Sequence, residues 1–197
     1  MRKLAMVIAG LSWMAGCAQQ PAKSTAAQAV AAAPAPPPED FRTFCTHAAC
    51  QHDVDVDLVQ ADGGKYHRHF DLLPPSVQPQ LITIYPGQKV QAAATFKDGK
   101  FAGWIDASAA KADDVILSFD LEQGSIGMTL SIHNDGQKLV KLDLSKLDLQ
   151  AASDEPQHTS SCPVFAGKGD FELWSEPVFE IDVVSADISP AAAGICN

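Results

Sequence analysis

Apolar and polar residues alternate along most of the chain beyond residue 50. Between residues 53 and 59, three aspartates alternate with valine and leucine, which is the period of two that a strand with one buried face requires. Residues 81–96 predict two more strands, one on either side of Pro86-Gly87. The same pattern continues in residues 101–107, 115–123, 125–133, 138–145 and 177–188. The chain is therefore predicted to consist mainly of β-strands.

Turn-forming residues separate the predicted strands. Asp98-Gly99 lies between two of them and accepts the positive φ angles of a tight hairpin turn. Residues 123–124 and 134–136 mark two further turns, whereas the helical candidate at 106–114 is short and lacks an apolar face. Short strands with turns about every 8 to 12 residues are typical of sandwiches. We therefore predict an all-β, mostly antiparallel, immunoglobulin-like β-sandwich.

The first 17 residues have the pattern of an export signal. Two basic residues precede an apolar run at 4–16, which is much shorter than the roughly 20 residues that span a bilayer. Met14-Ala15-Gly16-Cys17 resembles the lipobox of bacterial lipoproteins. This resemblance covers residues 1–17 and implies that Cys17 is lipidated and becomes the mature N-terminus. The acyl chains would then hold the protein on a membrane.

The residue after the lipidated cysteine bears on which membrane is used. In many Gram-negative lipoproteins, aspartate at that position implies retention at the inner membrane. This chain has Ala18 there. For a Gram-negative cell, the resemblance therefore implies an outer-membrane protein whose folded part faces the periplasm or the cell surface.

Composition divides the remainder into a tether and one domain. Residues 18–40 are almost entirely Ala, Pro and Gln, which cannot bury enough apolar surface to fold, so a disordered tether is expected. Residues 41–197 have the size of a single domain. Removing residues 1–17 takes away two basic residues and no acid, so the net charge changes from -10 to -12. Such a charge argues against a nucleic-acid partner and favours a basic protein partner.

Four cysteines other than Cys17 lie in the predicted domain, namely Cys45, Cys50, Cys162 and Cys196. An exported chain meets an oxidising compartment, so an even number of cysteines predicts disulfides. Three connectivities are possible. Closing the six-residue loop would contribute about 2 kcal/mol, and joining the two ends of the domain about 5 kcal/mol. Proximity in the chain favours Cys45–Cys50 with Cys162–Cys196, and the second bridge would attach the C-terminal tail.

A metal site is the alternative use of the histidines and cysteines. Cys45, His47, Cys50 and His52 include ligand types that suit zinc or Cu(I), but their spacing is not that of the paired ligands in structural zinc sites. No cofactor is predicted unless this metal hypothesis holds, and zinc or copper is expected if it does.

Two further histidines lie close together at His67 and His69. If residues 65–71 form a strand, both imidazoles share one face with Asp71, whereas Tyr66 and Phe70 point the other way. Two imidazoles on one face can chelate a divalent metal. The aspartates of residues 53–57 are predicted to form the solvated face of a strand, and His133 and His158 are expected in loops.

No catalytic motif is present, so no catalytic residues are predicted. The chain lacks a nucleophile elbow, a zincin motif, a P-loop and a dinucleotide-binding glycine pattern. The leading hypothesis is a lipid-anchored envelope protein that acts as a protein-binding or structural module. The alternative is a metal-binding lipoprotein that uses His47, His52, His67 and His69. A hydrolase with an unrecognised site is a third hypothesis, which would need convergent polar groups in a pocket.

Overall fold

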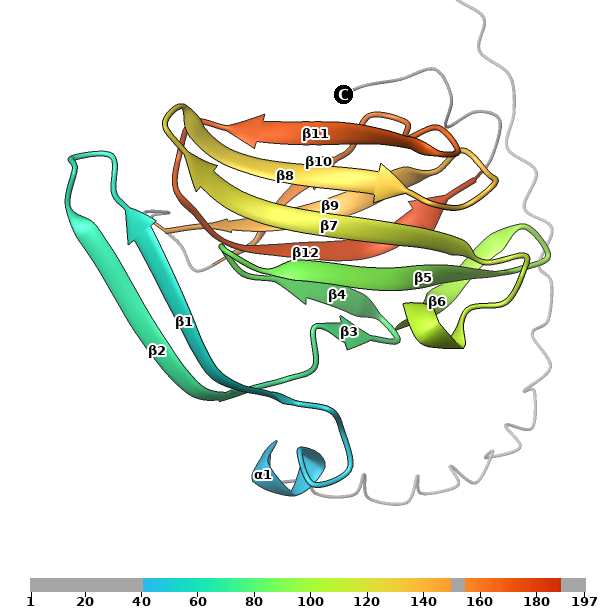
Figure 1. Ribbon diagram of the computed structural model, residues 1–197, viewed down its shortest axis with the longest axis horizontal. Coiled ribbons are helices and arrows are strands. Elements are labelled where there is room, and N and C mark those ends of the chain that lie inside the picture. The colour runs from blue at the N-terminus through green and yellow to red at the C-terminus, as the bar shows by residue number, and fades with distance from the viewer. Residues whose placement is uncertain (1–40, 150–154, 189–197) are drawn as a thin grey trace, which may run out of the picture. The chain divides into compact units, whose positions relative to one another are not determined.

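The computed structural model describes residues 41–149 and 155–188. Two five-stranded sheets form a sandwich, and a separate two-stranded hairpin lies beside it (Figure 1). Every strand pair among these residues is antiparallel. The prediction of an all-β, mostly antiparallel sandwich is confirmed. The lipobox, the tether of residues 18–40 and Cys196 lie outside the described residues.

The two sheets of the sandwich differ in the order of their strands. The first sheet has the order β10-β9-β12-β4-β3, and it pairs Ile84 of β4 with Ile181 of β12. The second sheet has the order β11-β8-β7-β5-β6. The strands of the sandwich are β3 (Val77–Gln78), β4 (Leu81–Ile84), β5 (Lys89–Lys97), β6 (Lys100–Asp106), β7 (Val115–Gly124), β8 (Gly127–Asn134), β9 (Lys141–Asp148), β10 (Gln157–Ser160), β11 (Lys168–Trp174) and β12 (Val178–Asp187).

The alternation in the sequence determines which side chains form the core. Inward-facing residues of β7 and β8 meet those of β4, β9 and β12 between the two sheets. Each large apolar side chain buried in this way stabilises the fold by about 1.5–3 kcal/mol. The largest of these fully buried side chains are Trp104, Phe119, Ile82, Ile84, Leu117, Leu121, Met128, Leu130, Ile132, Leu142, Leu144 and Ile181.

Local turn chemistry explains the predicted hairpin. Asp98 and Gly99 join β5 to β6 with φ angles of 53° and 75°, as a tight turn requires. The helical candidate at 106–114 forms a single 3-10 turn, η1 (Ala107–Ala109), and Asp106 caps it by accepting a hydrogen bond from the backbone N–H of Ser108. A short helix, α1 (Phe41–Phe44), precedes the first strand.

Two histidines that were expected in loops lie in strands instead. His158 belongs to β10, which pairs with β9, and His133 belongs to β8. The strand β10 has the sequence QHTS, and its lack of an apolar face conceals it from pattern analysis. It forms because it extends the edge of a sheet whose apolar face is already covered.

The hairpin of β1 (Gln51–Val59) and β2 (Lys65–Leu73), which we call the arm, packs one face against the sandwich. Tyr66 and Phe70 contact Phe179 of β12, with ring centroids 6.0 and 6.1 Å apart. Near the arm's turn, the amide of Gln123 accepts a hydrogen bond from Val59 N–H at 2.7 Å and donates one to Val59 C=O at 2.8 Å. These contacts leave the opposite face of the arm in solvent.

Candidate metal centre on the arm

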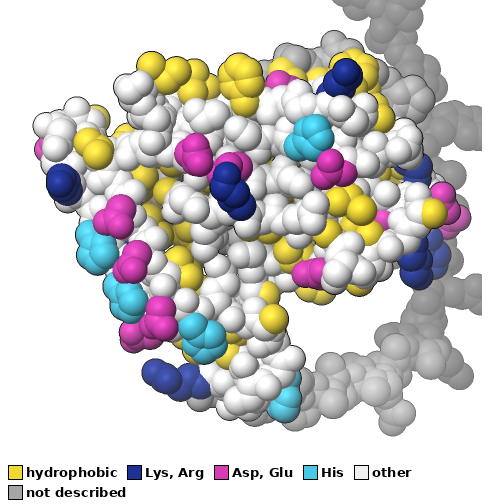
Figure 2. Space-filling model, viewed as in Figure 1, with side chains coloured by type: hydrophobic (Ala, Val, Ile, Leu, Met, Phe, Trp, Pro, Cys, Tyr) yellow, Lys and Arg dark blue, Asp and Glu magenta, His cyan; other side chains and the backbone are white. Residues whose placement is uncertain are grey.

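The pairing of β1 with β2 places aspartates opposite histidines on the solvent face of the arm. Asp57 pairs with His67 and Asp55 with His69. Because side chains alternate along each strand, these four groups share one face. Figure 2 shows histidine and acidic side chains alternating along the arm. The prediction of a solvated aspartate face on β1 is confirmed, and so is the placement of both imidazoles on one face of a strand.

His69 has the surroundings of a metal ligand. Its Nδ1 lies 2.8 Å from Asp55 Oδ1. Since a carboxylate accepts, Nδ1 carries a proton, so in the neutral ring the lone pair is on Nε2. Metal-bound imidazoles usually donate their second N–H to a carboxylate in this way. Nε2 faces Asp71 Oδ1 at 3.3 Å and Asp53 Oδ1 at 3.9 Å.

The spacing of these three groups suits one metal ion. One ligand atom from each of Asp53, His69 and Asp71 lies within 4.8 Å of the others. Two donors bound to zinc at about 2.1 Å are roughly 3.4 Å apart in tetrahedral geometry. The distances from His69 Nε2 are therefore close to those of a formed site. Small rotations of the aspartate side chains would complete it.

Asp53, one of the three grouped residues, has an unusual backbone conformation. Its φ angle is 53°, which is uncommon for a residue other than glycine, although aspartate tolerates it better than most. The ladder pairs His52 with Leu72 and Val54 with Phe70, but Asp53 is absent from it. The arm therefore contains one unpaired position at the point where Asp53 approaches His69.

His67 repeats part of the same arrangement one step nearer the arm's turn. Its Nδ1 lies 2.9 Å from Asp57 Oδ1, and its Nε2 lies 3.9 Å from Asp55 Oδ1. Asp55 is thus placed between the two imidazoles. In the described part of the chain, no second carboxylate faces His67 Nε2 in the way that Asp71 faces His69, so His67 lies beside the three-residue group and outside it.

The neighbouring carboxylates raise the pKa of His69 above its ordinary value of 6.5. The largest cause is the hydrogen bond to Asp55, and the charges of Asp55, Asp71 and Asp53 add to it. Carboxylates that stabilise a proton on the imidazole also attract a cation. The His69 side chain is 44% exposed, and those of Asp53 and Asp71 are 83% and 90% exposed. A bound ion would therefore keep water in its remaining coordination positions.

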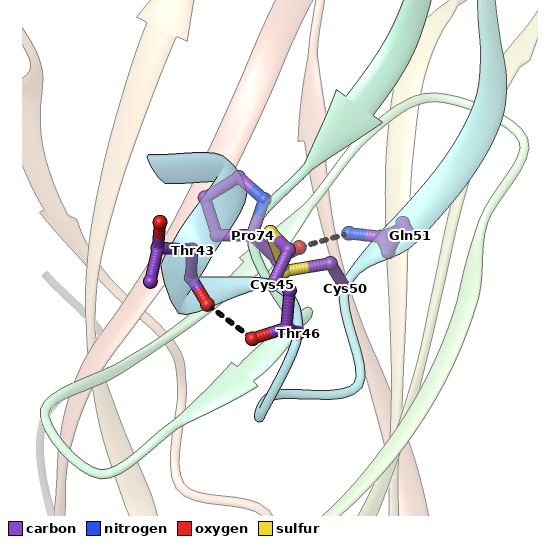
Figure 3. Close-up of a disulfide and its surroundings, with 6 residues drawn as sticks. All are labelled: Thr43, Cys45, Thr46, Cys50, Gln51 and Pro74. Atoms are coloured by element: carbon purple, nitrogen blue, oxygen red, sulfur yellow. Dashed lines mark hydrogen bonds between the residues drawn. A yellow bond between two sulfur atoms is a disulfide. The ribbon is translucent and has the colours of Figure 1, made fainter. Parts of the chain in front are cut away.

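The cysteines near the N-terminal end of the arm form a disulfide. The sulfurs of Cys45 and Cys50 are bonded, with Cα atoms 5.4 Å apart (Figure 3). Their thiols are therefore not available to a metal, and the predicted cluster of Cys45, His47, Cys50 and His52 is wrong as a thiolate site. The local pairing predicted for these two cysteines is confirmed. The loss of soft sulfur ligands leaves imidazole and carboxylate, which suit Zn²⁺ or Cu²⁺ better than Cu(I).

Hydrogen bonds connect this disulfide to the rest of the fold. Gln51, directly after Cys50, donates to Pro74 C=O at 3.0 Å, as Figure 3 shows. Its side-chain oxygen accepts from Gln88 at 2.7 Å, and Gln88 accepts from Tyr85 N–H at 3.1 Å. Gln51, next to the bridge, therefore connects the start of β1 with the residue after β2 and with Gln88.

The remaining predicted site residues lie elsewhere. His47 is in the turn after α1, and His52 pairs with Leu72. Among the described residues, neither forms an ion pair with a carboxylate. Cys162 is disulfide-bonded, so its sulfur is not a thiolate ligand although Asp170 and Glu172 lie near it. The pairing with Cys196 stays a prediction.

Sequence analysis missed two of the three grouped residues as ligands. Asp53 was assigned to a solvated strand face, and Asp71 was only noted as sharing the face of the histidines. The spacing His69-x-Asp71 was the available signal, because positions i and i+2 of a strand lie on one face. The approach of Asp53 could not be foreseen, since it depends on the pairing register and on a positive φ angle.

Comparison with protein-family models, with curated proteins and with solved structures gives no match for this chain. No described helix has the length and apolar character needed to cross a membrane. Any functional argument must therefore come from the residues and the geometry given above.

Proposed function

We propose that this protein is a lipid-anchored protein of the bacterial envelope whose arm binds a divalent transition-metal ion. The observation that carries the proposal is the group of Asp53, His69 and Asp71, with donor atoms within 4.8 Å of one another. The hydrogen bond from His69 Nδ1 to Asp55 supports it, because that bond leaves Nε2 free to coordinate. Zinc is the expected ion, and Cu²⁺ would bind more tightly if it were supplied.

Calorimetric titration of the oxidised protein with zinc chloride tests the metal site. We expect one ion per chain at neutral pH, and an affinity that falls by more than about tenfold in His69→Ala and in Asp71→Asn. His158→Ala is a matched control, because His158 also faces one aspartate, Asp143, at 3.0 Å but forms no ion pair with a second one among the described residues. Unchanged affinity in the His69 and Asp71 variants would place the metal elsewhere, and the absence of any heat would refute the site.

The lipid anchor rests on the lipobox resemblance at residues 14–17. Cys17→Ser in the full-length protein should abolish acyl labelling and move the protein from the membrane fraction to the soluble fraction. Retention of the variant on the membrane would contradict the anchor without affecting the metal site, because the folded domain is the same in both forms.

A basic protein partner is the second candidate. A hollow of about 410 Å³ beside the arm is lined in part by Asp55, Asp57 and Glu122, and the whole chain carries a net charge of -10. Association with a basic protein through this hollow would slow as salt is raised. It would weaken in Glu122→Gln, a variant that leaves the three metal ligands intact. Equally tight association with neutral and acidic envelope proteins would contradict this candidate.

A further inference from the structure

The outer face of the second sheet carries a groove that the arm does not share. Its volume is about 630 Å³, and four strands, β5, β7, β8 and β11, line it. The strand register arranges the outward side chains in two rows across the strands. The first row is Lys89, Asp120, Ser131 and Phe171, and the second is Gln91, Ser118, His133 and Gly169.

Small side chains create the hollow. Ser118 and Ser131 lie between longer side chains of the neighbouring strands, and Gly169 ends the second row on the edge strand β11. Lys89 and Gln91 on β5 form one wall, and Phe171 on β11 forms the opposite wall. Figure 2 views this face, and hydrophobic side chains gather along β11 at the top of the view.

The polar groups of the groove are held in place by one another. Gln91 donates to the Ser118 hydroxyl at 3.2 Å, and that hydroxyl donates to Asp135 at 3.2 Å. His133 lies 3.1 Å from the same aspartate. Lys89 and Asp120 form an ion pair, so their charges cancel. Groups fixed in this way lose little conformational freedom when a ligand binds.

Phe171 presents an aromatic ring to the solvent. The residue is 64% exposed, and its ring has no partner ring among the described residues. Leu173 follows two positions later on the same face of β11, is 46% exposed, and lies outside the groove. The groove thus combines one exposed aromatic ring with hydroxyl, amide and carboxylate groups whose net charge is small.

We propose that this groove binds an uncharged oligosaccharide with a flat, β-1,4-linked backbone. A sugar ring has an apolar C–H face that packs on an aromatic ring, and each hydroxyl both donates and accepts, as Ser, Gln, Asp and His require. Four strands about 4.8 Å apart span about 14 Å, which is the length of about three pyranose rings. An apolar ligand would take these polar groups out of water without offering them hydrogen bonds, and a charged ligand finds no unpaired opposite charge at Lys89–Asp120.

Titration of the 15N-labelled protein with cellotriose and with tri-N-acetylchitotriose tests the proposal by NMR. We expect chemical-shift changes at backbone amides of β5, β7, β8 and β11 with at least one of the two sugars. Phe171→Ala should weaken binding about tenfold. Leu173→Ala, the matched control on the same strand and face, should bind as the unaltered protein does.

Three outcomes would overturn the proposal. These are the absence of shifts with both sugars at millimolar concentration, shifts confined to other parts of the molecule, or equal weakening in Phe171→Ala and Leu173→Ala. The last result would locate binding on the apolar edge of β11 and favour a protein ligand. Both side chains are exposed, so both variants should fold, and unchanged resonances elsewhere would verify this. The metal site has no residue in this groove, so the two proposals fail independently.

Discussion

Asp55 is the residue on which the chemistry of the arm depends. One of its oxygens accepts from His69 Nδ1 at 2.8 Å and lies 3.9 Å from His67 Nε2. By accepting from Nδ1, it determines which nitrogen of His69 is free, and with its charge it stabilises the protonated ring. Proton and metal therefore compete for the same nitrogen, and a lower pH should weaken metal binding.

The pKa of His69 can be measured directly. It should lie above 6.5 in the metal-free protein, and Asp55→Asn should lower it, because the hydrogen bond to Asp55 is the largest cause of the shift. A raised histidine pKa contributes to stability below the unfolded value, and this contribution is lost as the pH rises through the folded value. NMR titration of the histidine ring protons is the measurement. A midpoint at or below 6.5 would contradict the geometry, and Asp135→Asn should leave His69 unaffected.

For single residues, the sequence predicted on which face of a strand a side chain lies, but not which side chains of the neighbouring strand it contacts. Strand periodicity was enough to place His67 and His69 together, because parity within one strand does not depend on tertiary contacts. That His69 lies opposite Asp55 depends on the register, and the register is determined by the turn at residues 60–64. Asp53 has the parity of Asp55 and lies between the pairs His52–Leu72 and Val54–Phe70. Its positive φ angle is the part that the sequence does not predict.

At the level of the elements, the backbones of β8 and β11 lie close together at Gly127. Its φ angle is 135°, and a Cβ atom added there would collide with the carbonyl oxygen of Trp174 and lie 3.1 Å from Ser175 Cα. Glycine at this position is therefore needed both for the conformation and for the space. This close contact lies at the end of β11, the strand that carries the aromatic wall of the groove.

Gly127→Ala should destabilise the protein by more than about 1 kcal/mol, because both the φ angle and the neighbouring backbone oppose a side chain. Gly124, which pairs with Gly127, is the matched control, since the nearest atom to an added Cβ lies at an ordinary 3.8 Å. Gly124→Ala should change the stability by less than about 0.5 kcal/mol. Urea unfolding followed by circular dichroism compares them, and equal midpoints for the two variants would show that the contact at Gly127 is relaxed easily.

Besides β10, the sequence failed to predict β11, which reverses the usual pattern. Its Phe171 and Leu173 are exposed, whereas Asp170 and Glu172 are partly buried. Asp170 to Leu173 do alternate between polar and apolar residues, but pattern analysis assumes that the apolar residues face inward, so it would assign the buried face of this strand wrongly. The exception coincides with the groove, as expected where a strand serves binding as well as packing.

For the molecule as a whole, the pH dependence of stability is determined more by the partly buried carboxyl groups of β12 than by the net charge. Glu180 and Asp182 are partly buried, and burial is the largest cause that raises the pKa of each. Hydrogen bonds to Tyr85 and to Thr83 oppose these shifts without cancelling them. Burial also raises the pKa of Glu172 on β11. In all three, the folded protein holds protons more tightly than the unfolded chain does.

These groups give stability an unusual dependence on pH. Between the unfolded pKa near 4.5 and the higher folded values, the native state binds more protons, so the free energy of unfolding falls as the pH rises. The raised pKa of His69 acts in the same direction at higher pH. The urea midpoint should therefore decrease between about pH 4 and pH 7. The double variant Glu180→Gln, Asp182→Asn should make this decrease smaller.

The control for this prediction is a carboxyl group with the opposite shift. Hydrogen bonds to Ser108 lower the pKa of the exposed Asp106. Asp106→Asn should therefore remove a contribution that is present above the unfolded pKa of 3.8 and is lost on acidification. A urea midpoint that rises with pH in the unaltered protein, and equally in the double variant, would show that Glu180 and Asp182 do not dominate.

The pairing of Ile84 with Ile181 has a consequence for the order in which the molecule can fold. The first sheet joins β4 to β12, so it stays incomplete until nearly the whole chain has been delivered, and such distant pairings are slow to form. The strand pairing and the disulfide of the arm join only neighbouring segments, β1 with β2 and Cys45 with Cys50, although its apolar face packs on Phe179 of β12. As the N-terminal end emerges first, the strand pairing of the arm and its disulfide can form while the sandwich that supports them is still unfinished.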